Sequence, residues 1–288
     1  MSYQQNPILT RVIDDLIGRY SDNIIAIYGI GSFFDDTLPP NWVKNDIDII
    51  VFVKTLESIP KQDWTEVRYK KRVIDEHQVW IGFNTIQAYQ DRYSFSKESY
   101  SNYEWSLIEL SYPENSKLIY GKDIRDQLPS VENLEFDYDD ILARGLYHLD
   151  KSIKEQESTE AKKKLSKAIF KIAFYFCLFF DPQFRRTSII EIGNNLRTLE
   201  KINKNSKKIL EFFEEALVFR ITEQYKSDFI KLREELIRFI FGMLENGSLH
   251  KKMIYQDMVK FLTNTYSGFP EINNILKKFF NDQIKKSK

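Results

Sequence analysis

The chain has 288 residues, of which 42% are hydrophobic and 15% aromatic, so it can bury a sizeable core in one large domain or two ordinary ones. Lysine and arginine number 42, as do aspartate and glutamate. The resulting zero formal charge argues against a protein whose main task is to coat nucleic acid, although it leaves room for a local basic patch. The single cysteine, Cys177, excludes an internal disulfide framework, and three scattered histidines supply no zinc ligand set.

The sequence contains neither a signal peptide nor an apolar run long enough to span a membrane. Residues 1–7 are polar and lack the apolar stretch of a signal peptide. The longest apolar run, residues 172–180, is far shorter than the roughly 20 residues of a membrane span. We therefore expect a cytoplasmic protein with no membrane partner.

The first elements of the chain lead to a glycine-containing turn. Apolar residues at helical spacing predict a helix over 7–19, and an apolar run predicts a strand over 24–28. This strand runs into Gly29-Ile30-Gly31-Ser32, where glycine lets the backbone approach a ligand closely. Ser32 offers a backbone N–H and a hydroxyl group to an anion. A short helix is expected over 32–36, followed by a proline-containing loop.

Two carboxylates open the next strand. Asp46 and Asp48 stand at the head of an apolar run that ends at Val53. Residues i and i+2 of a strand project to the same face, so both carboxylates lie on one side while Ile47 turns into the core. Like charges so close together are costly unless a cation neutralises them, and hard oxygen ligands suit Mg²⁺. An ordinary strand that begins with two surface aspartates is the structural alternative.

The remainder of the first half alternates strands and helices. We expect a polar helix over 62–76, a third strand over 78–86, a helix over 100–110 and a short strand over 117–121. Leu128-Pro129-Ser130 is a natural domain boundary.

Beyond about residue 136 the strand signals vanish and amphipathic helices take over. Short turns between helices favour antiparallel neighbours in a bundle, and an apolar face of such a bundle could pair with a second copy to form a homodimer. The expected helices cover 137–157, 159–180, 187–203, 207–222, 226–246, 249–265 and 270–285.

The order of these elements resembles a known signature. A strand, a Gly-Ser turn, about a dozen residues and an Asp-x-Asp pair that opens a second strand are similar to the DNA polymerase β-like nucleotidyltransferase superfamily, with Asn45-Asp46-Ile47-Asp48 where that family often has Ser-Asp-Ile-Asp. Lys117-Leu118-Ile119-Tyr120-Gly121 resembles the strand that closes many small catalytic domains of the family. The resemblance implies an α+β fold, with a catalytic domain over 1–130 and an all-α helical bundle over 131–288, as in aminoglycoside adenylyltransferases.

The same resemblance implies a reaction. Asp46 and Asp48 would be the catalytic residues and the ligands of Mg²⁺ or Mn²⁺, and Gly31 and Ser32 would hold the phosphates. The co-substrate would be ATP or another nucleoside triphosphate. The enzyme would transfer AMP to a hydroxyl group of a small-molecule acceptor such as an aminoglycoside-like compound, because metal-held phosphates and a positioned nucleophile suffice for this chemistry.

The sequence departs from the family at one catalytic position. The family usually supplies a third carboxylate from the next strand, but residues 79–83 contain no acid. The chain offers substitutes nearby, each of which is also a candidate surface acid. They are Asp75, Glu76, Glu109, Asp139 and Asp140.

Basic residues in the helical half supply a further expectation. Residues 162–170 and 185–188 resemble a passage in the helical domain of adenylyltransferases, and this resemblance implies that Arg186 or Lys167 would reach the triphosphate from the second domain, although lysines that solvate a helix explain the same pattern. The missing acid keeps open a degenerate nucleotidyltransferase that binds nucleotide, RNA or a protein. A protein-modifying adenylyltransferase of the antitoxin type is a third alternative.

Overall fold

A computed structural model describes residues 6–44, 46–64, 69–75, 77–92, 95, 103–136, 138–201 and 203–245. The chain divides into two compact units, each of which is discontinuous in sequence. The first unit comprises Met1–Phe136 together with Arg185–Ile192, and the second comprises Asp137–Phe184 together with Gly193–Lys288. The domain boundary expected at residue 130 stays a prediction. A single boundary there does not account for the segment Arg185–Ile192, which belongs to the first unit.

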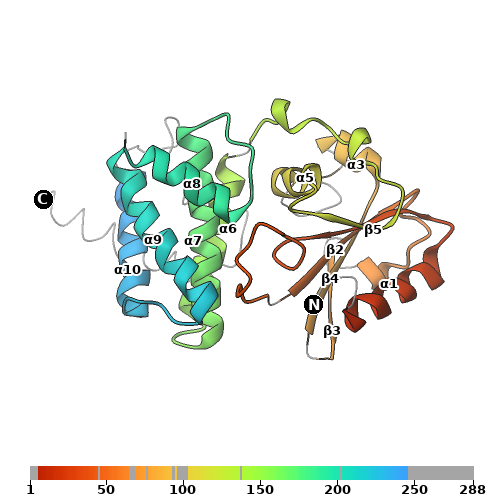
Figure 1. Ribbon diagram of the computed structural model, residues 1–288, viewed down its shortest axis with the longest axis horizontal. Helices are drawn as coiled ribbons and strands as arrows, with labels where there is room; N and C mark the ends of the chain where they lie inside the picture. Colours follow the sequence, from red (N-terminus) through yellow and green to blue (C-terminus); the bar gives the residue numbers. More distant parts are fainter. Residues whose placement is uncertain are drawn as a thin grey trace, which may run out of the picture. The chain divides into compact units, whose positions relative to one another are not determined.

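A mixed five-stranded sheet forms the centre of the first unit, with the order β3-β4-β2-β1-β5 (Figure 1). β2 runs parallel to β4, and every other neighbouring pair is antiparallel. The strands are β1 (Ile24–Ile30), β2 (Asp46–Val53), β3 (Tyr69–Ile74), β4 (His77–Asn84) and β5 (Lys117–Gly121). The sheet and the helices around it confirm the α+β class.

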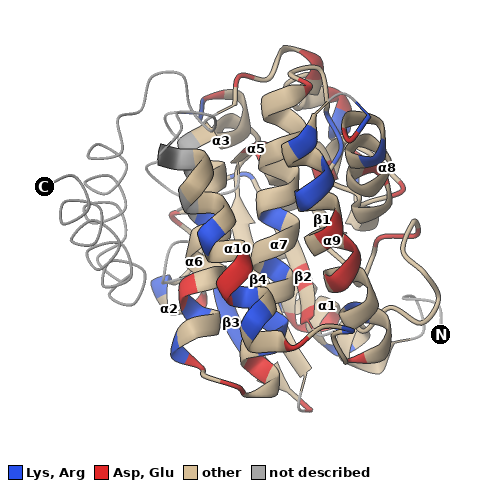
Figure 2. Cartoon of the chain, turned by 90° about the vertical axis from the view of Figure 1, so that its left-hand side faces the viewer, with Lys and Arg blue, Asp and Glu red and all other residues tan. Residues whose placement is uncertain are grey.

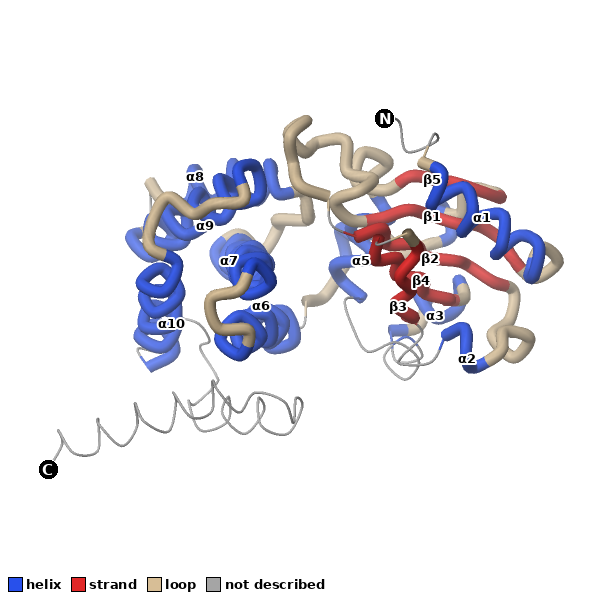
Figure 3. The backbone as a smooth tube through the Cα atoms, turned by 90° about the horizontal axis from the view of Figure 1, so that it is seen from below, coloured by secondary structure: helices blue, strands red, loops and turns tan. Residues whose placement is uncertain are grey.

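Helix α1 (Pro7–Tyr20) covers one face of this sheet (Figure 3). The side chain of Asn6 accepts hydrogen bonds from the N–H groups of Ile8 and Leu9, and Pro7 occupies the first turn, where its missing N–H costs nothing. The buried side of α1 then packs on alternate residues of the strands, such as Ile47 and Ile49 of β2.

Aromatic residues fill the opposite face of the sheet. Phe52 of β2 contacts Tyr28 of β1 and Tyr89 of α3 (Ile86–Gln90). Tyr89 in turn contacts Tyr103, which begins α5 (Tyr103–Ser111). Figure 1 shows α3 and α5 together above the sheet. Because each ring meets its neighbour at an angle or edge, the layer gains both apolar burial and favourable ring geometry.

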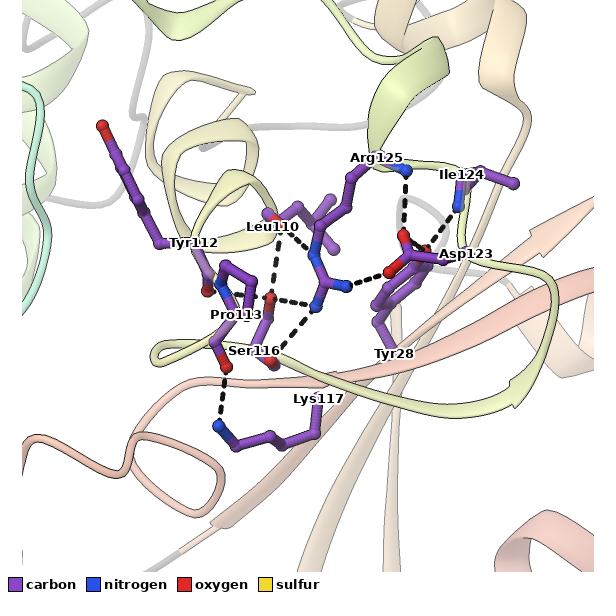
Figure 4. Close-up of polar contacts among 9 residues, drawn as sticks. All are labelled: Tyr28, Leu110, Tyr112, Pro113, Ser116, Lys117, Asp123, Ile124 and Arg125. Atoms are coloured by element: carbon purple, nitrogen blue, oxygen red, sulfur yellow. Dashed lines mark hydrogen bonds and ion pairs between the residues drawn. The ribbon is translucent and has the colours of Figure 1, made fainter.

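A hydrogen-bonded network ties α5 to β5 (Figure 4). The guanidinium of Arg125 donates to the carbonyl of Leu110 at 2.7 Å and to the carbonyl and hydroxyl of Ser116 at 3.2 and 3.1 Å. It also pairs with Asp123, which accepts from the Tyr28 hydroxyl. Burial and this carboxylate raise the pKa of Tyr28 to about 12. The network fixes the loop that joins α5 to β5.

Two expected elements of the first unit are wrong. Residues 62–76 form no single helix, because α2 (Lys61–Trp64) is short and β3 follows it as an edge strand paired with β4. Residues 32–36 form only a turn, in which the N–H groups of Phe34 and Asp35 both donate to the carbonyl of Gly31.

Helices alone make up the described part of the second unit, and they carry both signs of charge (Figure 2). Helix α7 (Thr159–Phe180) is almost wholly buried along its last four turns. Cys177 lies there, and burial raises the pKa of its thiol. None of the helices in the described ranges is both long and apolar enough to cross a membrane. The two expected helices over 249–265 and 270–285 lie outside the described residues. The helices are α6 (Tyr138–Lys154), α7 (Thr159–Phe180), α8 (Ile189–Leu199), α9 (Lys204–Thr222) and α10 (Phe229–Glu245), and the start of α8 belongs to the first unit.

Candidate active site

The structure brings the glycine-containing turn and the aspartate pair together. β1 and β2 are antiparallel, and Ile30 pairs with Asp48 at the end of the ladder. Gly31 follows with a φ of +72°, a left-handed conformation that side chains rarely adopt. A Cβ added to Gly31 would lie 2.9 Å from Oδ2 of Asp48, so only glycine leaves room for the carboxylate at this point.

A second glycine makes space for the turn itself. A Cβ on Gly29 would lie 2.3 Å from the ring of Phe34, which is buried in the core below. The two hydrogen bonds to the Gly31 carbonyl close the turn over residues 31–35. Ser32 lies in this turn and is partly exposed, so its hydroxyl and N–H can meet a ligand.

Asp46 and Asp48 project from the same face of β2. Both are partly exposed, whereas Ile47 between them is buried in the core with α1. The parallel pairing with β4 sets Gln78 beside Asp46 and Trp80 beside Asp48. The neighbouring strand is therefore where the sequence predicts it, and at the two positions beside the aspartates it offers an amide and an indole in place of a carboxylate.

The proposed substitutes for a third carboxylate do not join the pair in the described part of the chain. Asp75 lies in the turn between β3 and β4 and forms an ion pair with Arg11 at 3.1 Å. Glu109 lies on α5. Glu76 and the side chains of Asp139 and Asp140 lie outside the described residues. No group of three His, Cys, Asp or Glu side chains among the described residues could hold a metal ion.

The donor set nevertheless fits a magnesium ion. Mg²⁺ is usually bound through one or two carboxylates, with phosphate oxygens and water as the other ligands. Asp46 and Asp48 provide two carboxylates on one strand face, and the lack of a Cβ at Gly31 lets the Asp48 carboxylate lie against the turn.

A polar cluster lies beside the turn. Asp35 accepts hydrogen bonds from the N–H of Thr37 at 2.8 Å and from its hydroxyl at 2.5 Å. The Thr37 hydroxyl also lies 2.7 Å from that of Ser188, which belongs to the returning segment Arg185–Ile192. Burial raises the pKa of Asp35 despite these hydrogen bonds.

Arg186 is held inside the same unit as the aspartate pair. Its guanidinium pairs with Glu114 at 2.9 Å and with Glu191 at 3.4 Å, and it stacks on the ring of Tyr112 at 3.6 Å from the centroid. Burial raises the pKa of Glu191, and the nearby charges of Glu114 and Asp35 raise it further, while Arg186 opposes them. The expected phosphate role of Arg186 stays a prediction.

The sequence does not predict that Glu114 and Glu191 are the partners of Arg186. Their signal was weak, because Glu114 is 72 residues from Arg186 in sequence and lies in a turn. Ser188 and Glu191 have the spacing of a helix capping box, which gives a structural reason for both residues. The ion pairs therefore anchor the returning segment and also gather acidic groups near the turn.

Comparisons with known proteins give structural matches alone. No protein-family model and no curated protein matches this sequence. Among solved structures, spectinomycin adenyltransferase AAD(9) from Enterococcus faecialis, crystallised with ATP and spectinomycin, is 16% identical; the match covers 84% of this chain and 97% of that one, with a TM-score of 0.49. A nucleotidyltransferase-like protein from Exiguobacterium sibiricum 255-15 is 12% identical over 96% of this chain and 90% of that one, with a TM-score of 0.29.

Proposed function

We propose that the protein is a metal-dependent nucleotidyltransferase that transfers AMP from ATP to a hydroxyl group of a small-molecule acceptor. The observation that carries this proposal is the contact between Gly31 and Asp48, which places the Gly-Ser turn against the aspartate pair. Neither half of this motif is informative alone. Together they provide a turn for the phosphates at the end of β1 and two carboxylates at the start of the adjacent strand β2.

Each residue has a role in this proposal. Asp46 and Asp48 would hold Mg²⁺, which neutralises the charge of the phosphates when it is bound. Gly31 would let the phosphate chain approach the backbone, and Ser32 would donate hydrogen bonds to it. The acceptor hydroxyl would attack the α-phosphate in line, and pyrophosphate would leave. An aminoglycoside-like compound is the acceptor class that we would screen first.

Binding of ATP tests the proposal without knowledge of the acceptor. We expect calorimetry to detect ATP in the presence of Mg²⁺ and to show little binding without the metal. The double variant D46N/D48N should lose at least about tenfold in affinity, because each neutral amide is a poorer metal ligand than a carboxylate. A matched variant, D14N/D22N, removes two exposed charges from the same unit and should bind normally.

The missing third carboxylate supports a second candidate function. A degenerate nucleotidyltransferase would bind nucleotide, or a macromolecular partner, without turnover, since Gln78 and Trp80 occupy the strand positions beside the aspartates. Pyrophosphate release in an acceptor screen separates the two functions. Metal-dependent ATP binding with no product from any acceptor would favour the degenerate protein, and a folded protein that binds no nucleoside triphosphate would rule out both nucleotide roles.

A further inference from the structure

One lysine connects the two halves of the site. The ammonium group of Lys44 donates a hydrogen bond to the carbonyl of Phe33 at 2.9 Å and lies 5.4 Å from the centre of the Phe33 ring. Phe33 directly follows Ser32, and Lys44 stands two residues before Asp46. A single side chain thus spans from the approach to the aspartate pair to the edge of the Gly-Ser turn.

The charge of Lys44 remains available at this position. Its described contacts are a neutral carbonyl and an aromatic ring, and the side chain is exposed. An ammonium group has three N–H donors, so the bond to Phe33 leaves two for a ligand. The Phe33 carbonyl holds the group beside the turn and does not neutralise its charge.

Arg186 offers a contrast within the same unit. Two carboxylates, those of Glu114 and Glu191, already pair with its guanidinium. A phosphate that recruited Arg186 would have to compete with both ion pairs, whereas a phosphate that recruited Lys44 would compete only with water for the remaining donors.

We infer that Lys44 is a binding residue for the triphosphate chain of the nucleotide. The inference rests on the proposed function, since it concerns the same turn and the same co-substrate. It assigns the cationic contact of the first unit to the lysine two residues before Asp46 and leaves Arg186 with its anchoring role.

The test compares two lysines at opposite ends of β2. Lys54 also donates to a backbone carbonyl, that of Asp22, at 2.7 Å and is also exposed. We expect K44M to weaken ATP and inorganic tripolyphosphate about tenfold in the presence of Mg²⁺, because both contain the phosphate chain. K54M loses the same kind of hydrogen bond and should bind both ligands as the unaltered protein does.

Two further measurements separate binding from stability. K44R keeps the positive charge and should retain most of the affinity, and K44M and K54M should have similar melting temperatures. Equal ATP affinity for K44M and K54M would overturn the inference while leaving the proposed function intact. Loss of ATP binding in D46N/D48N but not in K44M would likewise overturn the inference and leave the proposed function intact. If the unaltered protein binds neither ATP nor tripolyphosphate, the proposed function fails and the inference falls with it.

Discussion

The two ends of the β1–β2 pair are built from similar residues and behave differently. At the end near Ile24 and Val53, Asn23 accepts from the N–H of Thr55 and donates to its carbonyl, at 3.1 and 2.8 Å. The lysine there, Lys54, donates to a carbonyl across the pair. The polar groups at this end therefore satisfy one another.

At the other end, the ladder stops at Asp48 and the chain turns away through Gly31. Two carboxylates share one strand face there, and Lys44 crosses the loop to reach Phe33. The same lysine-to-carbonyl hydrogen bond therefore has different surroundings at the two ends: it lies beside the Asn23 side chain at one end, and at the other it bridges the loop between Gly31 and Asp46. The two ends also differ in charge, because the carboxylates of Asp46 and Asp48 lie on the strand that follows Lys44.

The largest expected effect comes from Gly31→Ala at the site end. The left-handed conformation costs an L-residue about 1–2 kcal/mol, and the added Cβ would push against Oδ2 of Asp48. We expect ATP affinity to fall more than about tenfold, because the carboxylate must move. Calorimetry with Mg-ATP measures this loss.

Gly18→Ala is the matched control for that substitution. Nothing lies within 4 Å of a Cβ at Gly18, which lies in helix α1. Alanine should therefore stabilise the helix by up to about 1 kcal/mol and leave ATP binding unchanged. Normal ATP affinity in Gly31→Ala would contradict the close contact between the turn and the aspartate pair.

An intermediate effect is expected from Asn23→Ala at the opposite end. The variant loses bonds to both the carbonyl and the N–H of Thr55 and one to the hydroxyl of Ser58, at a cost of about 1–2 kcal/mol. Thermal unfolding should show a lower melting temperature, while ATP affinity stays the same. Asn23→Asp keeps the acceptor for the Thr55 N–H, so its melting temperature should lie between those of Asn23→Ala and the unaltered protein. A binding defect in Asn23→Ala would show that the two ends are coupled.

The smallest effect concerns Asp35 and pH. Burial raises the pKa of this carboxyl in the folded protein above the ordinary Asp value of about 3.9. The protonated form therefore contributes stability that is complete below about pH 3.9 and is lost as the pH rises through the folded-state pKa. An asparagine can still accept from Thr37. We therefore expect the free energy of unfolding of Asp35→Asn at pH 7 to be equal to that of the unaltered protein or higher by less than about 1 kcal/mol. This difference should disappear toward pH 4.

Urea unfolding between pH 4 and 7 measures this difference. Asp36→Asn removes a charge from an exposed neighbour in the same loop, where Asp36 pairs with Lys117, and controls for net charge. A difference between Asp35→Asn and the unaltered protein that stays constant with pH would contradict the burial of the Asp35 charge.

The elements that the sequence predicts well are those whose signals are local. β1 and β2 are apolar runs next to glycine or aspartate, and β5 ends at Gly121, so both the motif and its strands could be recognised. β3 was missed because Lys70-Lys71-Arg72 interrupts any alternation of apolar residues. Its polar side chains find distant partners, such as Asp63 and Asp15 for Arg72, and it gains its backbone bonds from β4.

The surroundings of the site could not be predicted for the same reason. The contact between Thr37 and Ser188 joins residues 151 positions apart, and no periodic pattern marks such a pair. The absence of a carboxylate on β4, by contrast, was readable from the sequence. The parallel register then shows which residues, Gln78 and Trp80, lie beside the aspartates.

The returning segment Arg185–Ile192 has a consequence for dissection of the protein. Because this segment belongs to the first unit, the chain passes between the units three times, after Phe136, Phe184 and Ile192. A fragment that ended at Phe136 would lack the partners of Thr37 and Glu114 and the hydrogen bond that Arg185 donates to the carbonyl of Val131. One cut therefore cannot yield two complete units. A chimaera that replaced the second unit with that of another protein would have to keep Arg185–Ile192, because this segment belongs to the first unit.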